Sequence, residues 1–260
     1  DYEFISINFN NPVLQDIYVR KALMHGINRT AIIEKHLLGN AVITDTPIRV
    51  DSWLYDGDIN KYSYNKAEAQ YAINSARFVL NEATGVFERE SDGKLQQLRL
   101  TLITNSENDY RVKAVEDIKR DLEDIGFVID VQIMPFEELM KRIEKKQYDL
   151  ALVGMNFSPE ADLYDFLHSS QINSSKNYGG YSNPRVDLLL EQSQSTLNPE
   201  NKYLNYLELQ RIIKDDLPII SLFYKEYALV MRNKIRGEIK ADSENLFRTI
   251  NNWYISESLN

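Results

Sequence analysis

The sequence contains no cysteine among its 260 residues. A chain without cysteine forms no disulfide, binds no metal through thiolates and has no cysteine nucleophile. It also lacks a basic tract, and its 39 acidic residues outnumber 30 lysines and arginines to give a net charge of −9. Because an acidic surface repels phosphates, we expect no nucleic-acid partner. No apolar run is long enough to span a bilayer.

Motifs of common enzyme and cofactor sites are missing as well. The chain has no GxSxG nucleophile turn, no Walker loop and no GxGxxG turn. Its three histidines, His25, His36 and His168, are far apart, and none has a second metal-ligand type at helical spacing. The many acidic pairs lie beside lysines and arginines, which favours solvated helix faces over a glycosidase pair. We therefore predict no catalytic residue, no metal site and no cofactor.

The pattern of apolar residues predicts an α/β fold. Residues 98–104, 127–134 and 148–155 are apolar enough for strands, and helical stripes separate them. A strand–helix–strand–helix–strand order predicts a parallel sheet with right-handed crossovers. Ligands of such sheets bind beyond the carboxyl ends of the strands. This points above all to the segment from Met155 to Asp162.

Several other elements are marked by their first residues. Helical stripes follow Asn28 and Asn65 and the Asn-Pro pairs at 183–184 and 198–199, which predicts four capped helices. Residues 2–9 alternate apolar and polar side chains and predict a strand. Residues 40–64, which include Trp53, predict a long loop of the kind that is usually functional or packed on a surface.

Asp162 is the acidic residue with the most informative position. It lies just past the third predicted strand and just before a short apolar helix predicted at 162–169. Its carboxylate could cap that helix, or it could face the ligand crevice. The local pattern leaves both interpretations open.

Six segments, in order along the chain, resemble the large peptide, dipeptide and nickel solute-binding family of ABC transporters. They are residues 16–33 (DIYVRKALMHGINRTAII), 64–69 (YNKAEA), 98–131, 148–154 with 162–167 (YDLALVG and DLYDFL), 181–189 (YSNPRVDLL) and 216–220 (DLPII). Six matches in this order across nearly the whole chain make the resemblance specific. The chain departs from the family pattern at Met155, where the family often has tryptophan, and in lacking a proline after Asp162.

The resemblance implies an α/β fold of the type II, peptide-binding class of periplasmic binding proteins. It implies one lobe, with a mostly parallel sheet flanked by helices, plus hinge-crossing strands. Residues 1–12 would form a crossing strand, 13–217 the second ligand-binding lobe, and 218–260 the return crossing and the C-terminal part of the first lobe. We expect the rest of the first lobe to lie outside this sequence.

The resemblance also implies a function. The chain would bind oligopeptides or dipeptides for an ABC importer by hinge closure around the ligand, and it would catalyse nothing. By match to the family motif, Asp162 would hold the ligand's free α-amino group. Met155, Asn156, Phe157 and Trp53 are the other expected ligand-binding residues.

The implied partners are the transporter's permease and the first lobe of the same protein, in a monomer. The implied location is outside the cytoplasm, on a cell-surface lipoprotein or in a periplasm, as a soluble domain. Two alternatives remain open from sequence. One is the ligand-sensing domain of a transcription regulator built on the same fold, and the other is an unrelated α/β hydrolase.

Overall fold

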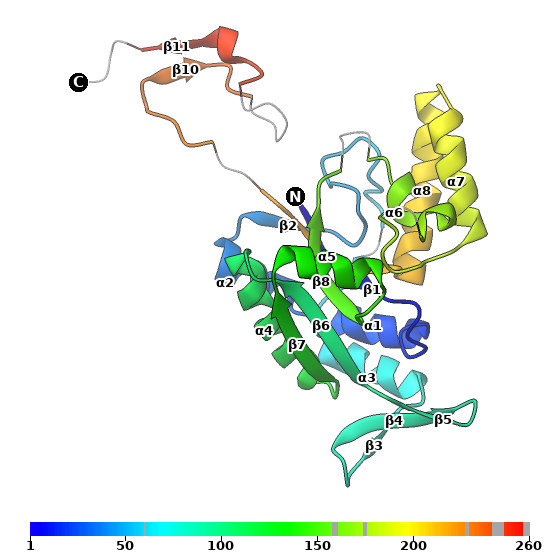
Figure 1. Ribbon diagram of the computed structural model, residues 1–260. Helices are drawn as coiled ribbons and strands as arrows, with labels where there is room; N and C mark the ends of the chain where they lie inside the picture. Colours follow the sequence, from blue (N-terminus) through cyan, green and yellow to red (C-terminus); the bar gives the residue numbers. More distant parts are fainter. Residues whose placement is uncertain (60, 158–160, 174–175, 227–228, 241–246, 257–260) are drawn as a thin grey trace. The chain divides into compact units, whose positions relative to one another are not determined.

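The computed structural model describes residues 1–59, 61–157, 161–173, 176–226, 229–240 and 247–256. The chain divides into two compact units, Asp1–Lys225 and Glu226–Asn260. The first unit contains a six-stranded sheet, a three-stranded sheet and helices α1 to α8 (Figure 1).

The six-stranded sheet is mixed, which corrects the expectation of a mostly parallel one. Its order is β2 (Ala41–Ile43), β9 (Ile219–Lys225), β1 (Tyr2–Ile7), β8 (Leu150–Met155), β6 (Arg99–Asn105) and β7 (Val128–Met134). Strand β6 pairs parallel with β7 and β8, as predicted, whereas the pairs β1–β8, β1–β9 and β2–β9 are antiparallel. Strand β1 lies between β8 and β9 and runs against both. The direction of such a strand depends on distant partners, which periodicity does not reveal.

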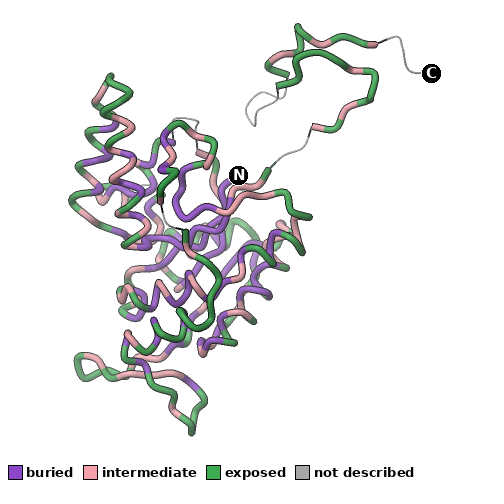
Figure 2. The backbone as a smooth tube through the Cα atoms, turned by 180° about the vertical axis from the view of Figure 1, so that it is seen from behind, coloured by how far each residue is buried: buried purple, intermediate pink, exposed green. Residues whose placement is uncertain are grey.

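Helices cover both faces of this sheet. One core contains Ile5, Leu150 and Leu152 together with apolar side chains of α1 (Ile17–Gly26), α2 (Arg29–Leu37), α3 (Lys66–Ser75) and α4 (Asp109–Glu123). The other contains Phe4, Ala151 and Val153 with side chains of α5 (Phe136–Glu144), α6 (Tyr164–Leu167), α7 (Pro184–Ser195) and α8 (Pro199–Asp216). Successive strand residues thus enter opposite cores. Strand β1 is buried along its whole length, and β8 is buried from Leu150 to Val153 (Figure 2).

The predicted helix starts are confirmed by their capping contacts. Asn28 Oδ1 accepts a hydrogen bond from the backbone N–H of Ala31 at 3.0 Å, and Asn65 Oδ1 accepts one from Ala67 at 3.0 Å. The asparagines before Pro184 and Pro199 make the same kind of contact. Each cap satisfies a backbone donor that the helix itself leaves unpaired, so the local sequence alone defines these four boundaries.

Between α3 and β6 the chain forms a three-stranded meander. Its strands are β3 (Val79–Asn81), β4 (Val86–Ser91) and β5 (Lys94–Gln97), all antiparallel. A turn with Asp92 and Gly93 at positive φ joins β4 to β5, as two-residue hairpin loops require. Figure 1 shows the meander at the end of the first unit opposite α7 and α8.

The second unit is small. It contains a two-stranded antiparallel pair, β10 (Ile235–Gly237) with β11 (Trp253–Ile255), and the short 3₁₀ helix η2 (Ile250–Asn252). Of its described residues, none is buried, and Val230 and Ile255 are largely exposed. In the described part of the whole chain, no helix is long and apolar enough to cross a membrane.

Candidate functional site

A hollow of about 210 Å³ lies just past the carboxyl end of β8. Its described lining comes from the end of β8, from α6 and the turn before it, and from the loop after the short helix η1 (Ser169–Gln171): Met155, Asn156, Phe157, Asp162, Asp165, Phe166 and Lys176. The parallel strands β6, β7 and β8 all end at this edge of the sheet. The structure therefore brings four of the five predicted ligand-binding residues together, at the edge where sheets of this kind bind ligands.

The fifth residue, Trp53, lies elsewhere. It belongs to the irregular segment between β2 and α3, is 53% exposed and is not among the residues that line the hollow. That segment is anchored by a buried ion pair of 2.6 Å between Arg29 and Asp45 and by a hydrogen bond of 2.8 Å from Gln210 to the Leu54 carbonyl. A role for Trp53 in ligand binding stays a prediction.

Asp162 lies one residue before Leu163, which is the N-cap residue of α6. Its Oδ1 accepts a hydrogen bond of 2.9 Å from the backbone N–H of Tyr164, so the carboxylate does help to start α6. Gln194 of α7 donates to the same carboxylate at 3.2 Å. The residue is nevertheless exposed and lines the hollow. A carboxylate has about four lone-pair positions, so these contacts leave it able to accept further hydrogen bonds.

The backbone before Asp162 is held in an unusual conformation. Ala161 has a φ of +50°, a left-handed value that costs free energy in a residue with a Cβ atom. The buried hydroxyl of Tyr206 donates a hydrogen bond of 2.7 Å to the Ala161 carbonyl. Burial, and to a lesser degree the charge of Asp162, raise the pKa of Tyr206, so this hydroxyl keeps its proton well into the alkaline range. Helix α8 thereby fixes the turn that presents Asp162.

Two phenylalanines form an aromatic wall in place of the tryptophan that the resemblance led us to expect at Met155. Phe157 and Phe166 meet edge to face with 5.3 Å between ring centroids. Phe157 also packs against Tyr2, and Phe166 against Phe4, which places both rings in contact with buried side chains of β1. Aromatic contacts of this geometry stabilise by about 1 kcal/mol each. The wall is therefore held by the sheet itself.

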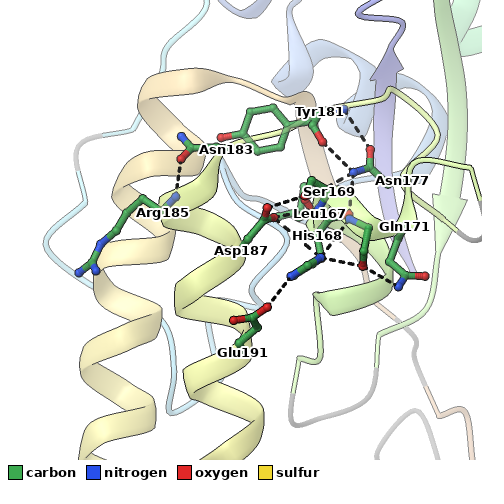
Figure 3. A network of polar contacts seen from close by, with 11 residues as sticks. Leu167, His168, Ser169, Gln171, Asn177, Tyr181, Asn183, Arg185, Asp187 and Glu191 are labelled. Carbon is green, nitrogen blue, oxygen red and sulfur yellow. Dashed lines mark hydrogen bonds and ion pairs between the residues drawn. The ribbon is translucent and has the colours of Figure 1, made fainter.

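Asn177 holds the loop that carries Lys176. Its side-chain N–H groups donate to the carbonyls of Leu167, His168 and Tyr181, and its Oδ1 accepts from the backbone N–H groups of Gly180 and Tyr181. The side chain is buried, and Figure 3 shows it between α6 and the loop. Five hydrogen bonds from one buried amide tie two walls of the hollow together.

His168 is part of the same network, and its surroundings explain it without a metal. Its Nδ1 accepts a hydrogen bond of 3.1 Å from the backbone N–H of Ser170, so its Nε2 carries the proton and faces Glu191 at 3.3 Å (Figure 3). The ring stacks on Tyr164 with 4.2 Å between centroids. Ser169 donates to Asp187 through both its backbone N–H and its hydroxyl. These contacts join α6 and η1 to α7.

A second cluster of charges lies at the same edge of the sheet, on strands β1 and β9. The fully buried carboxylate of Glu3 pairs with Arg111 at 2.9 Å and with Lys225 at 3.1 Å. Arg111 also donates to Asn105 at the end of β6. Gly154 lies opposite Glu3 in β8, and a Cβ atom there would overlap the Arg111 guanidinium. The glycine is therefore required because the ion pair crosses the strand at this point.

Sequence patterns gave no indication of Arg111, Glu3, Lys176 or Asp165 as members of these clusters. Glu3 occupies a polar position of an alternating strand, which normally indicates solvent exposure. A glycine inside the apolar strand at 148–155 was the one available signal, since such a glycine often marks a close approach of other groups.

The chain was compared with known proteins. The model of the bacterial extracellular solute-binding proteins, family 5 Middle, matches residues 1–175. The oligopeptide-binding protein AppA of Bacillus subtilis is 26% identical over 98% of this chain and 47% of its own. The probable D,D-dipeptide-binding periplasmic protein DdpA of Escherichia coli is 24% identical over 90% of this chain and 43% of its own.

Solved structures agree with these matches. AppA in complex with a nonapeptide superposes with a TM-score of 0.82, covering 98% of this chain and 51% of that one. NikZ of Campylobacter jejuni, in complex with nickel and L-histidine, superposes with a TM-score of 0.79 at 25% identity. The match covers 97% of this chain and 51% of NikZ. The chain thus spans about half the length of the relatives that it matches, and its fold is that of type II periplasmic binding proteins. None of the relatives named here is a transcription regulator or a hydrolase, so those two alternatives gain no support.

Proposed function

Because this chain belongs to family 5 of the bacterial extracellular solute-binding proteins, we propose that it is the second ligand-binding lobe of a receptor for oligopeptides or dipeptides. The receptor delivers its ligand to the permease of an ABC importer, with hinge closure as the binding step. The observation that carries the proposal is the hollow past β8, which combines exposed carboxylates with an aromatic wall. The family is one of binding proteins, and we propose that this member catalyses nothing.

Asp162 holds the ligand's free α-amino group. An ammonium entering a closed, water-poor cleft needs a charged acceptor, and a hydrogen bond between two charged groups is about twice as strong as a neutral one. The carboxylate is already oriented by Tyr164 and Gln194, so little side-chain freedom is lost when the ligand binds. Met155, Asn156 and Phe157 contact the first residues of the peptide, and Trp53 reaches the ligand only after closure.

Residues 1–12 and 218–225 are the crossings between lobes, and residues 226–260 belong to the first lobe. Two features support this division. Strands β1 and β9 are neighbours, and the charge cluster of Glu3, Arg111 and Lys225 joins them where the crossings leave the lobe. The described part of 226–260 buries none of its residues, which fits a segment whose packing partners belong to the rest of the receptor.

The receptor acts as a monomer outside the cytoplasm, as a cell-surface lipoprotein or in a periplasm. Its partners are the peptide, the permease and the remainder of its own first lobe, and nucleic acid is not among them. The net charge of −9 agrees with the last point.

Titration of the full-length receptor tests the proposal. Matched peptides with free and with acetylated amino termini are measured calorimetrically against the unaltered receptor and against Asp162→Asn. We expect acetylation to weaken binding to the unaltered receptor at least tenfold and to have little effect on the variant, because the charge partner is then missing. Equal affinity of the unaltered receptor for both peptides would contradict the role of Asp162. Gln70→Glu, an exposed change of opposite sign on α3, serves as a folding control.

The 260-residue chain alone offers a second test. It supplies half of the contacts of a closed receptor, so it should bind peptides more weakly than micromolar. Micromolar or tighter binding by this chain would contradict the two-lobe proposal.

A further inference from the structure

The hollow past β8 contains charges of both signs. Asp162 and Asp165 contribute carboxylates, and Lys176 contributes an ammonium from the loop after η1. Among the residues that the structure describes, no ion pair links any of these three groups to another side chain, whereas Arg185 on α7 is paired with Glu208. A ligand that carries both an ammonium and a carboxylate can pair with these opposite charges: its ammonium with the aspartates and its carboxylate with the lysine.

The position of Lys176 is set by the loop that carries it. Its carbonyl accepts a hydrogen bond of 2.7 Å from the backbone N–H of Tyr178. Its neighbour Asn177 is the buried amide whose hydrogen bonds tie the loop to α6. The backbone of Lys176 is therefore fixed relative to α6, which carries Asp165. A lysine anchored in this way keeps its ammonium within reach of the hollow while its long stem adapts.

The volume of the hollow limits how far apart the two ligand charges can be. About 210 Å³ is room for about seven water molecules, at about 30 Å³ each. That is enough for one or two amino-acid residues and too little for a longer peptide. The ligand carboxylate that meets Lys176 must therefore lie within a residue or two of the ammonium that meets the aspartates.

We propose that Lys176 is a specificity-determining residue that selects ligands with a carboxylate close to their free amino group. The proposal rests on the proposed function, because the peptide's amino end must enter this hollow. Two kinds of peptide carry such a carboxylate. One is a dipeptide, through its own carboxyl terminus, and the other is a longer peptide with an acidic side chain at its first or second residue.

Four probes and one substitution test the role of Lys176 in the 260-residue chain. The probes are alanyl-alanine, alanyl-alaninamide, glutamyl-alaninamide and glutaminyl-alaninamide. Binding is followed through the amide NMR signals of residues around the hollow, which report affinities in the millimolar range. Lys176→Met removes the ammonium and keeps most of the stem. Lys94→Met in the β4–β5 hairpin makes the same change on an exposed residue far from the hollow in sequence and serves as the matched control.

We expect Lys176→Met to weaken binding of one of the two acidic probes about threefold, as the loss of an exposed ion pair does. If the substitution lowers the affinity for alanyl-alanine but not for alanyl-alaninamide, Lys176 binds the terminal carboxylate. If the substitution lowers the affinity for glutamyl-alaninamide but not for glutaminyl-alaninamide, Lys176 binds an acidic side chain of the ligand. The same change for all four probes, or no change for any, overturns the proposal, and Lys94→Met should leave all four affinities unaltered.

Acetyl-alanyl-alanine separates this proposal from the role of Asp162. If it binds as well as alanyl-alanine and still loses affinity on Lys176→Met, the role of Asp162 is wrong and that of Lys176 stands. If it binds more weakly than alanyl-alanine but Lys176→Met changes no affinity, the proposed role of Asp162 is supported and that of Lys176 is wrong. Absence of shifts around the hollow with every probe overturns the role of Lys176, whereas the role of Asp162 is decided by the titration of the full-length receptor.

Discussion

Replacement of Gly154 by alanine should break the charge cluster on which β1, β8 and β9 depend. The new Cβ atom would overlap the guanidinium of Arg111 and lie 2.8 Å from Glu3 Oε1, closer than real Cβ atoms approach other groups. One of these two groups must move. Glu3 cannot turn to water, because its side chain is fully buried, so the ion pair opens.

The magnitude follows from that burial. Removing one partner of a buried ion pair costs about 3–5 kcal/mol, because a charge is left without compensation. Lys225 still contacts Glu3 at 3.1 Å after the change, which limits the cost. We expect Gly154→Ala to lower the free energy of unfolding by about 3 kcal/mol. Urea denaturation followed by circular dichroism measures this loss as a lower midpoint with an unaltered slope.

A double-mutant cycle identifies the cause. In an Arg111→Ala background the guanidinium is absent, which removes the group nearest to the added Cβ atom. Gly154→Ala should then lower the free energy of unfolding by about 1 kcal/mol or less. The coupling free energy between the two sites should therefore be about 2 kcal/mol. Additive costs would refute the argument that the glycine exists to let the ion pair cross β8.

Three further predictions concern stability. Burial tends to raise the pKa of Asp117, but hydrogen bonds from Lys35, His36 and Arg120 outweigh it and lower the pKa from 3.8 to about 2. A lowered folded-state pKa contributes stability above the unfolded-state value, and this stability is lost as pH falls through the folded one. Because Lys35 and Arg120 are exposed and water screens their charges, about 1 kcal/mol should disappear between pH 5 and about 2. Urea denaturation across this range should show the loss, and Asp117→Asn should reduce it; an unaltered pH profile would contradict the assignment. Asn177→Ala removes a hydrogen-bond partner from five backbone groups, of which the His168 carbonyl and the Gly180 N–H keep another, and it should cost about 3 kcal/mol, with faster amide exchange in the following loop. A cost below 1 kcal/mol would show that water replaces the amide. Tyr206→Phe removes the hydrogen bond to the Ala161 carbonyl and should cost about 1 kcal/mol by thermal denaturation, and full stability would mean that α8 does not hold this turn.

Local sequence signals predicted the helix starts and the edge of the sheet where the hollow lies. Asn28 and Asn65 each cap a helix because a cap needs only a side-chain oxygen and a few following backbone donors. The order of strands and helices from 98 to 155 predicted the parallel part of the sheet, since a crossover helix constrains strand direction. Asp162 was selected from its position after β8 and from its match to the family motif, and its role in ligand binding stays a prediction.

Features that depend on distant partners could not be predicted in this way. Strand β1 is antiparallel to both neighbours, and one neighbour lies more than 200 residues along the chain. Glu3 and Arg111 meet across Gly154 although 108 residues separate them. Lys176 joins the hollow only because the Asn177 hydrogen bonds return its loop to α6. In each case the side chain is ordinary in its local context and becomes informative only through a contact made on folding.

A crystal structure of the full-length receptor with a bound peptide tests the central claim most directly. The decisive quantity is the distance from the peptide's α-amino nitrogen to the nearest carboxylate oxygen of Asp162. We predict about 2.8 Å, the length of a hydrogen bond between charged groups. A peptide whose amino group is held by other residues, with Asp162 bonded only to Tyr164 and Gln194, would contradict the account.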